Sequence, residues 1–103
     1  MSDDVRLSQS ALKVLRHLVE TPRQGRSGAD MSKAAQVGSG TLYPMLARLE
    51  AAGWLVSEWE AIDPSEAGRP RRRFYTLTGV GQTRALAALA ELQVATSSGQ
   101  ALG

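Results

Sequence analysis

Residues 39–77 read SGTLYPMLARLEAAGWLVSEWEAIDPSEAGRPRRRFYTL, and this stretch decides the fold. Its first part predicts a helix over residues 39–52, because apolar side chains recur three and four positions apart. Gly53 follows at the position where glycine commonly ends a helix. Pro44 is expected in the first turn, where a missing amide hydrogen costs least. The stripe expected to be buried consists of Leu42, Met45, Leu46 and Leu49.

The second part of the stretch predicts a β-hairpin. Residues 54–60 alternate between apolar and polar side chains, as a strand with one buried face does. Residues 63–68, DPSEAG, favour a turn. Residues 71–77 then form the returning strand, to which three residues bring β-favouring bulk: Phe74, Tyr75 and Leu77. A helix therefore runs directly into a hairpin.

The hairpin is basic, because four arginines occupy five consecutive positions: Arg69, Arg71, Arg72 and Arg73. A solvated edge strand is the alternative interpretation of such a cluster taken by itself. A helix beside a basic hairpin, however, is the arrangement in which a winged helix-turn-helix holds double-stranded DNA. The helix enters the major groove and the hairpin, or wing, reaches neighbouring phosphates.

The four arginines are not expected to serve equally. Strand alternation places Arg71 and Arg73 on one face and Arg72 on the other. Arg69 at the turn and one alternate set are expected to reach DNA. The others are expected to pair with an acid across the hairpin, either Glu58 or Glu60.

Two helices are expected before residue 39. Apolar residues at helical spacing predict the first over residues 8–20, with Ser8 as N-cap. TPRQGRSG, residues 21–28, is a loop by composition. A short second helix is expected over about 29–37, with three residues turned inward: Met31, Ala34 and Ala35.

A last helix is expected after the hairpin, capped by Thr78 and running to about Ala95. Its segment ALAALAELQVA is apolar on more than one face, so it must cover its own domain and something else besides. The predicted organisation is a winged-helix domain at 1–78, a C-terminal helix at 79–96 in the same compact domain, and a frayed tail at 97–103.

Composition narrows the function classes. The 103 residues suit one domain, which buries about 60–70% of its unfolded surface. The chain has no cysteine and a single histidine, His17, which excludes disulfides, thiolate metal sites and a multi-histidine site within one chain. The net charge of +2 is too small to argue for nucleic acid alone. There is no membrane-spanning run and no signal-peptide core, so a cytoplasmic location is expected.

The outward side of the helix at 39–52 supplies the DNA-contact candidates. An N-terminus suits phosphate, and hydroxyl groups can add hydrogen bonds to the backbone or to base edges. Simple capping is an equally open role for Ser39 and Thr41, a half-buried core position is the alternative for Tyr43, and a solvated lysine is the alternative for Lys33. With the four wing arginines, the candidates are Lys33, Ser39, Gly40, Thr41, Tyr43, Pro44 and Arg48.

The two tryptophans have different expected roles. Trp54 directly follows Gly53 and is expected to anchor the wing to the core. Trp59 lies on the opposite face of the hairpin, where core or interface packing is favoured over contact with a small-molecule effector. Trp59 is nevertheless the one named candidate for effector contact.

The strings GTLYPMLARLEAAGWL and GRPRRRFYTLT, followed by a terminal helix, resemble the PadR family of transcriptional regulators over nearly the whole chain. The resemblance implies a mainly α (α+β) winged helix-turn-helix with three helices, a two-stranded wing and a C-terminal dimerisation helix. It also implies a homodimer that binds a palindromic operator, usually as a repressor. In this sequence the dimer contacts would fall on Leu86, Leu89, Ala90, Leu92 and Val94.

Some small members of that family sandwich flat aromatic drugs between tryptophans of the terminal helix. The terminal helix of this sequence contains no aromatic residue, so the remaining candidate for an effector site is a pocket lined by leucine, alanine and Trp59.

The sequence is compatible to different degrees with three classes of function. A dimeric DNA-binding repressor explains the basic wing and the two-faced last helix together. A winged helix that docks a partner protein without binding DNA explains the last helix but gives the arginines no task. An enzyme is not expected, because no catalytic triad, paired carboxylates or phosphate loop can be assembled; Gly38-Ser39-Gly40 has no following GK[ST]. No cofactor, metal or membrane partner is expected.

Overall fold

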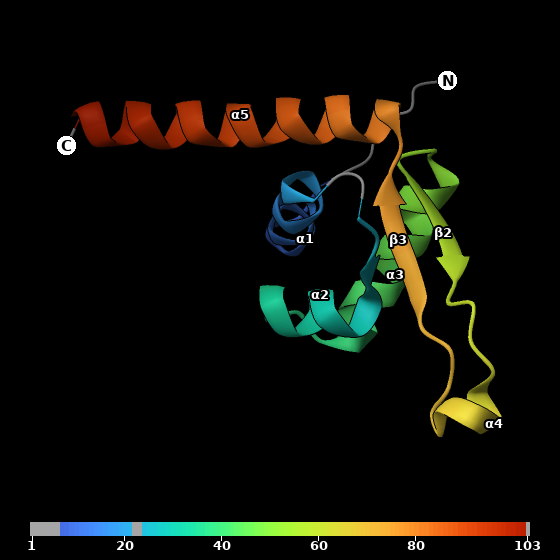
Figure 1. The fold of residues 1–103 in the computed structure, drawn as a ribbon. Helices are drawn as coiled ribbons and strands as arrows, with labels where there is room; N and C mark the ends of the chain where they lie inside the picture. The colour runs from blue at the N-terminus through green and yellow to red at the C-terminus, as the bar shows by residue number, and fades with distance from the viewer. Residues whose placement is uncertain (1–6, 22–23, 103) are drawn as a thin grey trace.

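The computed structural model describes residues 7–21 and 24–102, of which 92–102 are described by their backbone alone. Within these residues the chain is mostly helical, with a small antiparallel sheet of three strands in the order β1-β3-β2 (Figure 1). The core lies where α1, α2, α3 and the sheet meet, and the wing and the last helix extend from it in different directions. No helix among the described residues has the length and apolar character needed to cross a membrane.

Helix α1 spans Gln9–Glu20 and confirms the predicted first helix. The hydroxyl of Ser8 accepts a hydrogen bond from the amide of Ala11 at 3.1 Å, which satisfies one of the free donors of the first turn. One face of α1 is buried in the core through Ala11, Val14, Leu15 and Leu18.

Helix α2 spans Gly28–Ala35 and is shorter than predicted. It ends early because Gln36 adopts a left-handed conformation with φ of 56°, while the amide of Val37 bonds back to the carbonyl of Ser32. Met31 and Ala35 are buried as predicted. The inward position predicted for Ala34 is wrong: its side chain is exposed, because Met31 and Ala35 already occupy the buried side of so short a helix.

Helix α3 spans Ser39–Ala51 and buries the predicted stripe of leucines and Met45. Its end is a Schellman motif: Gly53 has φ of 83°, and the amides of Gly53 and Trp54 bond to the carbonyls of Glu50 and Leu49. The first-turn position predicted for Pro44 is wrong. Because α3 begins at Ser39, Pro44 lies inside the helix and has no amide hydrogen to give to the preceding turn.

The wing consists of β2, Leu55–Trp59, and β3, Arg73–Leu77, with the short helix α4, Pro64–Ala67, at its tip (Figure 1). The strands pair from Leu55 opposite Leu77 to Trp59 opposite Arg73. The predicted turn at 63–68 thus contains one helical turn. Asp63 caps it through a hydrogen bond from the amide of Ser65, and Gly68 closes it at φ of 71°.

Strand β1, Arg26–Ser27, corrects the loop predicted for residues 21–28. It adds a third strand by pairing with Phe74 and Tyr75 of β3. Gly25 precedes it where a Cβ atom would stand only 2.9 Å from the Cβ of Phe74, so the absence of a side chain permits the approach.

Helix α5 spans Gly79–Leu102, and the predicted end near Ala95 is wrong. Extending an existing helix costs far less than starting one, so the small polar residues that follow continue it. Thr78 caps α5 as predicted, accepting from the amide of Gly81 at 2.9 Å. The helix crosses α1, and its C-terminal part projects beyond the body of the domain (Figure 1).

Candidate nucleic-acid interface

The outward side of α3 is a continuous polar and small-residue surface. All of its predicted DNA-contact residues are exposed: Ser39, Gly40, Thr41, Tyr43, Pro44 and Arg48. The N-cap of α3 is Gly38, and no side chain makes a capping hydrogen bond there. The capping role left open for Ser39 and Thr41 is therefore not the one that the structure shows, and both residues are exposed. Lys33, on α2, is exposed as well.

Tyr43 is 45% exposed, so it is a surface residue whose ring is only partly covered. Its ring lies against the start of α2, where a Cβ on Gly28 would stand within 2.6 Å of the ring carbon Cε1. This contact packs α3 against α2, and the phenolic oxygen is the Tyr43 atom nearest to the Cβ position at Gly28. It depends on the glycine at position 28, whose role was not apparent from the sequence.

Arg69 forms a two-point ion pair with Glu60 across the wing. Its Nη1 and Nη2 atoms donate to Oε1 and Oε2 of the carboxylate at 2.7 and 2.9 Å. The hydrogen bonds from Arg69 lower the pKa of Glu60 to about 2, with a smaller contribution from the backbone amide of Arg72. The cross-hairpin pairing expected of the strand arginines thus belongs to Arg69, the residue expected to reach DNA from the turn.

Among the described residues, Arg71 and Arg72 are exposed and take no part in the wing's two ion pairs, which belong to Arg69 and to Arg73, itself exposed. Arg71 is exposed, and its Nε donates to the carbonyl of Ile62 at 3.0 Å. The guanidinium of Arg72 is exposed and makes no hydrogen bond or ion pair with the residues that the structure describes. The predicted strand alternation does not apply to these two residues, because Pro70 and the tip helix delay β3 until Arg73.

Arg73 is held by a network that the sequence did not predict. Its Nε donates to the hydroxyl of Ser57 at 2.9 Å, and its Nη2 lies 3.4 Å from the Glu50 carboxylate. Ser57 in turn donates to Glu50 at 2.7 Å. The guanidinium carbon also lies 5.5 Å from the ring centre of Trp59 and 5.7 Å from that of Tyr75.

A cleft of about 520 Å³ lies where α3, the start of α2 and the wing meet. The aromatic side chains of Tyr43, Trp59 and Tyr75 and the wing arginines line it, with Ser27, Gly28 and Ala29 at the α2 side. The cleft therefore joins Tyr43 of α3 to the basic part of the wing in one concave surface. Positive charge and polar groups on such a surface suit the backbone of a nucleic acid.

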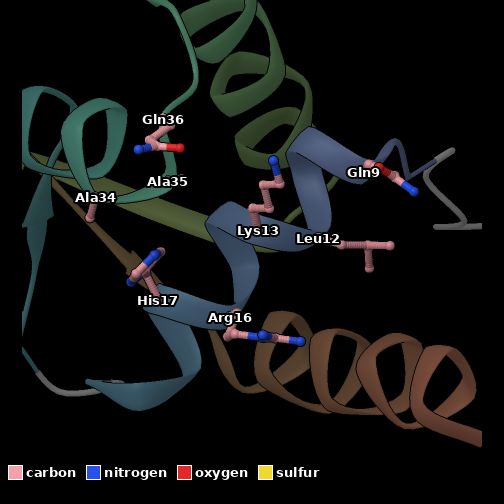
Figure 2. Close-up of a pocket in the computed structure, with 8 residues that line it drawn as sticks. All are labelled: Gln9, Leu12, Lys13, Arg16, His17, Ala34, Ala35 and Gln36. Carbon is pink, nitrogen blue, oxygen red and sulfur yellow. The ribbon is translucent and has the colours of Figure 1, made fainter. Parts of the chain in front are cut away.

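A second groove of about 440 Å³ lies between α1 and α2, and Figure 2 shows the residues around it. Leu12, Ala34 and Ala35 provide apolar surface, and polar side chains surround them: Gln9, Lys13, Arg16, His17 and Gln36. The arginine extends beside α5 (Figure 2). Trp59 belongs to the wing cleft, so the predicted effector contacts of leucine, alanine and Trp59 are split between two surfaces.

Comparisons with known proteins agree with this geometry. The sequence matches the transcriptional regulator PadR-like family over residues 14–87. The crystal structure of smu.1704 from Streptococcus mutans UA159 is 26% identical, with a TM-score of 0.67, and the alignment covers 89% of this chain and 85% of that one. A PadR-like transcription factor from Bacteroides fragilis is 23% identical, with a TM-score of 0.67 and coverage of 92% and 93%.

A structure of reduced AbfR bound to DNA is 29% identical, with a TM-score of 0.62, and the alignment covers 81% of this chain and 52% of that one. No curated protein sequence matches the chain.

Proposed function

The chain belongs to the PadR-like family of transcriptional regulators, and we propose that it binds double-stranded DNA as a homodimer and represses transcription from a palindromic operator. The observation that carries the proposal is the concave surface on which Tyr43 of α3 meets Arg71 and Arg72 of the wing, next to the other exposed residues of α3. The DNA-bound structure of the similar protein AbfR supports the choice of ligand.

Helix α3 is the element that enters the major groove in this proposal. Its Ser39, Thr41 and Tyr43 are exposed residues with hydroxyl groups, and hydroxyl groups bond to both phosphates and base edges. The small Gly40 allows close approach to the groove floor, and Pro44 lies on the same exposed side. Replacing Tyr43 or Thr41 should therefore alter sequence preference.

Basic residues provide the part of the affinity that does not depend on sequence. Arg71 and Arg72 of the wing and Arg48 of α3 are exposed, as is Lys33 of α2. Arginine and lysine at phosphates release counterions, so each contact makes binding more sensitive to salt. Arg69 contributes by fixing the wing tip through Glu60.

Helix α5 is proposed to hold the two subunits together. Its 24 residues span about 36 Å, and within the chain it packs on α1 and β3. Leu86 is 49% exposed, Leu89 is half-buried and Ala90 is exposed, which leaves an apolar face for a second copy. The side chains of Leu92 and Val94 lie outside the described residues. A two-fold dimer would place its recognition helices about 34 Å apart, one turn of DNA.

The first test is enrichment of binding sites from a random double-stranded DNA library with the purified chain at moderate salt. A two-fold symmetric motif with half-sites about one turn apart is expected. Light scattering of the free protein and of its complex with the enriched site checks the dimer. A folded chain that enriches no sequence would refute DNA recognition by this chain alone and favour a winged helix that docks a partner protein.

Repression is tested separately, by placing the enriched site between a promoter and a reporter gene. Expression of the chain should lower reporter output, and a scrambled site should abolish the effect. Higher output would show an activator instead. Adding candidate small molecules to the same reporter tests for an effector, which the groove between α1 and α2 has room to bind.

A further inference from the structure

Trp59 is a large aromatic side chain that the core does not use. It is 60% exposed at the end of β2, whereas the other tryptophan, Trp54, is 3% exposed in the core. The core or interface packing favoured for Trp59 from the sequence is thus not provided within the chain. Its ring lines the cleft between the wing and the recognition helix. Tryptophan is enriched at binding interfaces, because it combines a large apolar ring with a polar N–H.

Arg73 holds Trp59 in this position. The two residues are directly opposite each other in the β2–β3 pairing, and the guanidinium lies over the tryptophan ring at 5.5 Å. Arg73 is itself fixed by its bonds to Ser57 and Glu50. Glu50 is in the last turn of α3, so these contacts form a brace, Glu50–Ser57–Arg73, between the recognition helix and the wing.

We infer that Trp59 contacts the sugar–phosphate backbone of DNA in the cleft, and that Arg73 positions Trp59 without contacting phosphate itself. The inference rests on the proposed function and assigns two residues within it. A tryptophan ring offers apolar surface to deoxyribose and an indole N–H to a phosphate oxygen. Its neighbours at the cleft, Arg71 and Arg72, have exposed guanidinium groups suited to adjacent phosphates.

The brace explains why Arg73 differs from those neighbours. Its Nε donates to Ser57 and its Nη2 to Glu50, and its guanidinium lies near the rings of Trp59 and Tyr75. A phosphate contact through Nε or Nη2 would require Arg73 to leave these partners, and the Glu50 carboxylate would then lose its ion pair. Lysine cannot replace the planar, forked guanidinium in such a stack.

The contact is tested by tryptophan fluorescence, because the two tryptophans differ in exposure. Acrylamide, a neutral quencher, should quench exposed Trp59 in the free protein and leave buried Trp54 largely unaffected. Saturating amounts of the enriched DNA site should reduce quenching to the level of the Trp59→Phe variant, in which Trp54 alone emits. Unchanged quenching of Trp59 in the saturated complex would overturn the contact.

Affinity variants test the positioning role. Trp59→Ala should weaken binding about tenfold, because covering an exposed aromatic side chain is of that order, and should leave the salt dependence unchanged. Arg73→Lys retains the charge but loses the brace, so we expect it to weaken binding several-fold with an unchanged slope of log K against log salt. Thermal unfolding of each variant shows whether the variant still folds. Trp59→Phe, which keeps an aromatic ring, is a second variant with which to test the contact of residue 59 with DNA.

The opposite result for Arg73 is equally clear. If Arg73 contacts phosphate, Arg73→Lys binds like the wild-type chain, and Arg73→Gln lowers the salt slope by about 0.9. That outcome would overturn the positioning role. A wild-type chain that binds no DNA at all would refute the proposed function instead, so the two failures are distinguishable.

Discussion

Salt dependence of DNA binding provides a quantitative test of which wing arginines meet phosphate. Arg71 and Arg72 are exposed, and the guanidinium of Arg72 has no hydrogen-bond or ion-pair partner in the described part of the chain. Each phosphate contact contributes about 0.9 to the slope of log K against log salt. Replacing both residues by alanine should therefore reduce the slope by about 1.8.

The consequence is large enough to measure by fluorescence anisotropy with a labelled duplex. When salt is raised from 50 to 200 mM, a slope lower by about 1.8 means that the affinity of the wild-type chain falls by a factor roughly twelve times larger than that of the double variant. At low salt the double variant should bind more weakly, and the two curves should converge as salt rises. Binding to non-cognate duplex should weaken to a similar degree, because phosphate contacts carry no sequence information.

Arg16→Ala is the matched control. Arg16 is an exposed arginine of α1 beside the groove of Figure 2, so the substitution removes one positive charge, half of that removed by the double variant, at a distance from the wing. Its slope should equal that of the wild-type chain. A double variant with a wild-type slope would refute the assignment. A loss of slope of about 0.9 in Arg16→Ala, half of that expected for the double variant, would show that net charge, not local contact, controls binding.

Further predictions concern stability and are checked by urea or thermal unfolding. Gly53→Ala should lower the free energy of unfolding by about 1–2 kcal/mol, because φ of 83° is unfavourable for a residue with a Cβ. Gly81→Ala should lower it by more, because its Cβ would overlap the carbonyl of Trp54. A variant as stable as the wild-type chain would contradict the corresponding prediction. Gln36→Gly should raise the free energy of unfolding by up to about 1 kcal/mol, since relief of the left-handed conformation exceeds the added chain entropy; a loss of stability would contradict it. The pKa of Glu60 is lowered from 4.5 to about 2, so its ion pair with Arg69 stabilises the fold above about pH 4.5, and this contribution is lost as the pH falls toward 2. Glu60→Gln should flatten the dependence of the free energy of unfolding on pH in that range. An unchanged dependence would refute the role of the pair.

Local patterns predicted the elements that are long enough to show a regular repeat of apolar residues. The apolar stripe of α3 and the glycine at its end identified both the helix and its stop, and Gly53 indeed occupies the left-handed position. The hairpin was recognisable because its strands alternate. The end of α2 was misjudged because Gln36 adopts a conformation usually left to glycine. Strand β1 was missed because two residues have no periodicity; its pairing depends on β3, far away in sequence.

The candidate site was predictable in its location but not in its internal pairing. Residue types alone placed DNA contacts on α3 and the wing. They did not show that Arg69 would pair with Glu60 while Arg73 turned to Ser57 and Glu50, because these choices depend on how far the tip helix delays the second strand. The exposure of Trp59 was likewise invisible, since its face of the hairpin continues past the edge of the core.

The junction between α3 and α5 has a geometric consequence for operator choice. Thr78 donates from its hydroxyl to the carbonyl of Gly53 at 2.6 Å and from its amide to that of Trp54 at 2.9 Å, so the end of one helix and the start of the other share one joint. In the proposed dimer, α5 acts as a lever about 36 Å long fixed at that joint. A tilt of about 10° would move its far end by roughly 6 Å, which approaches two base-pair steps of about 3.4 Å each. The angle set at Thr78 would thus determine the half-site spacing that the protein accepts.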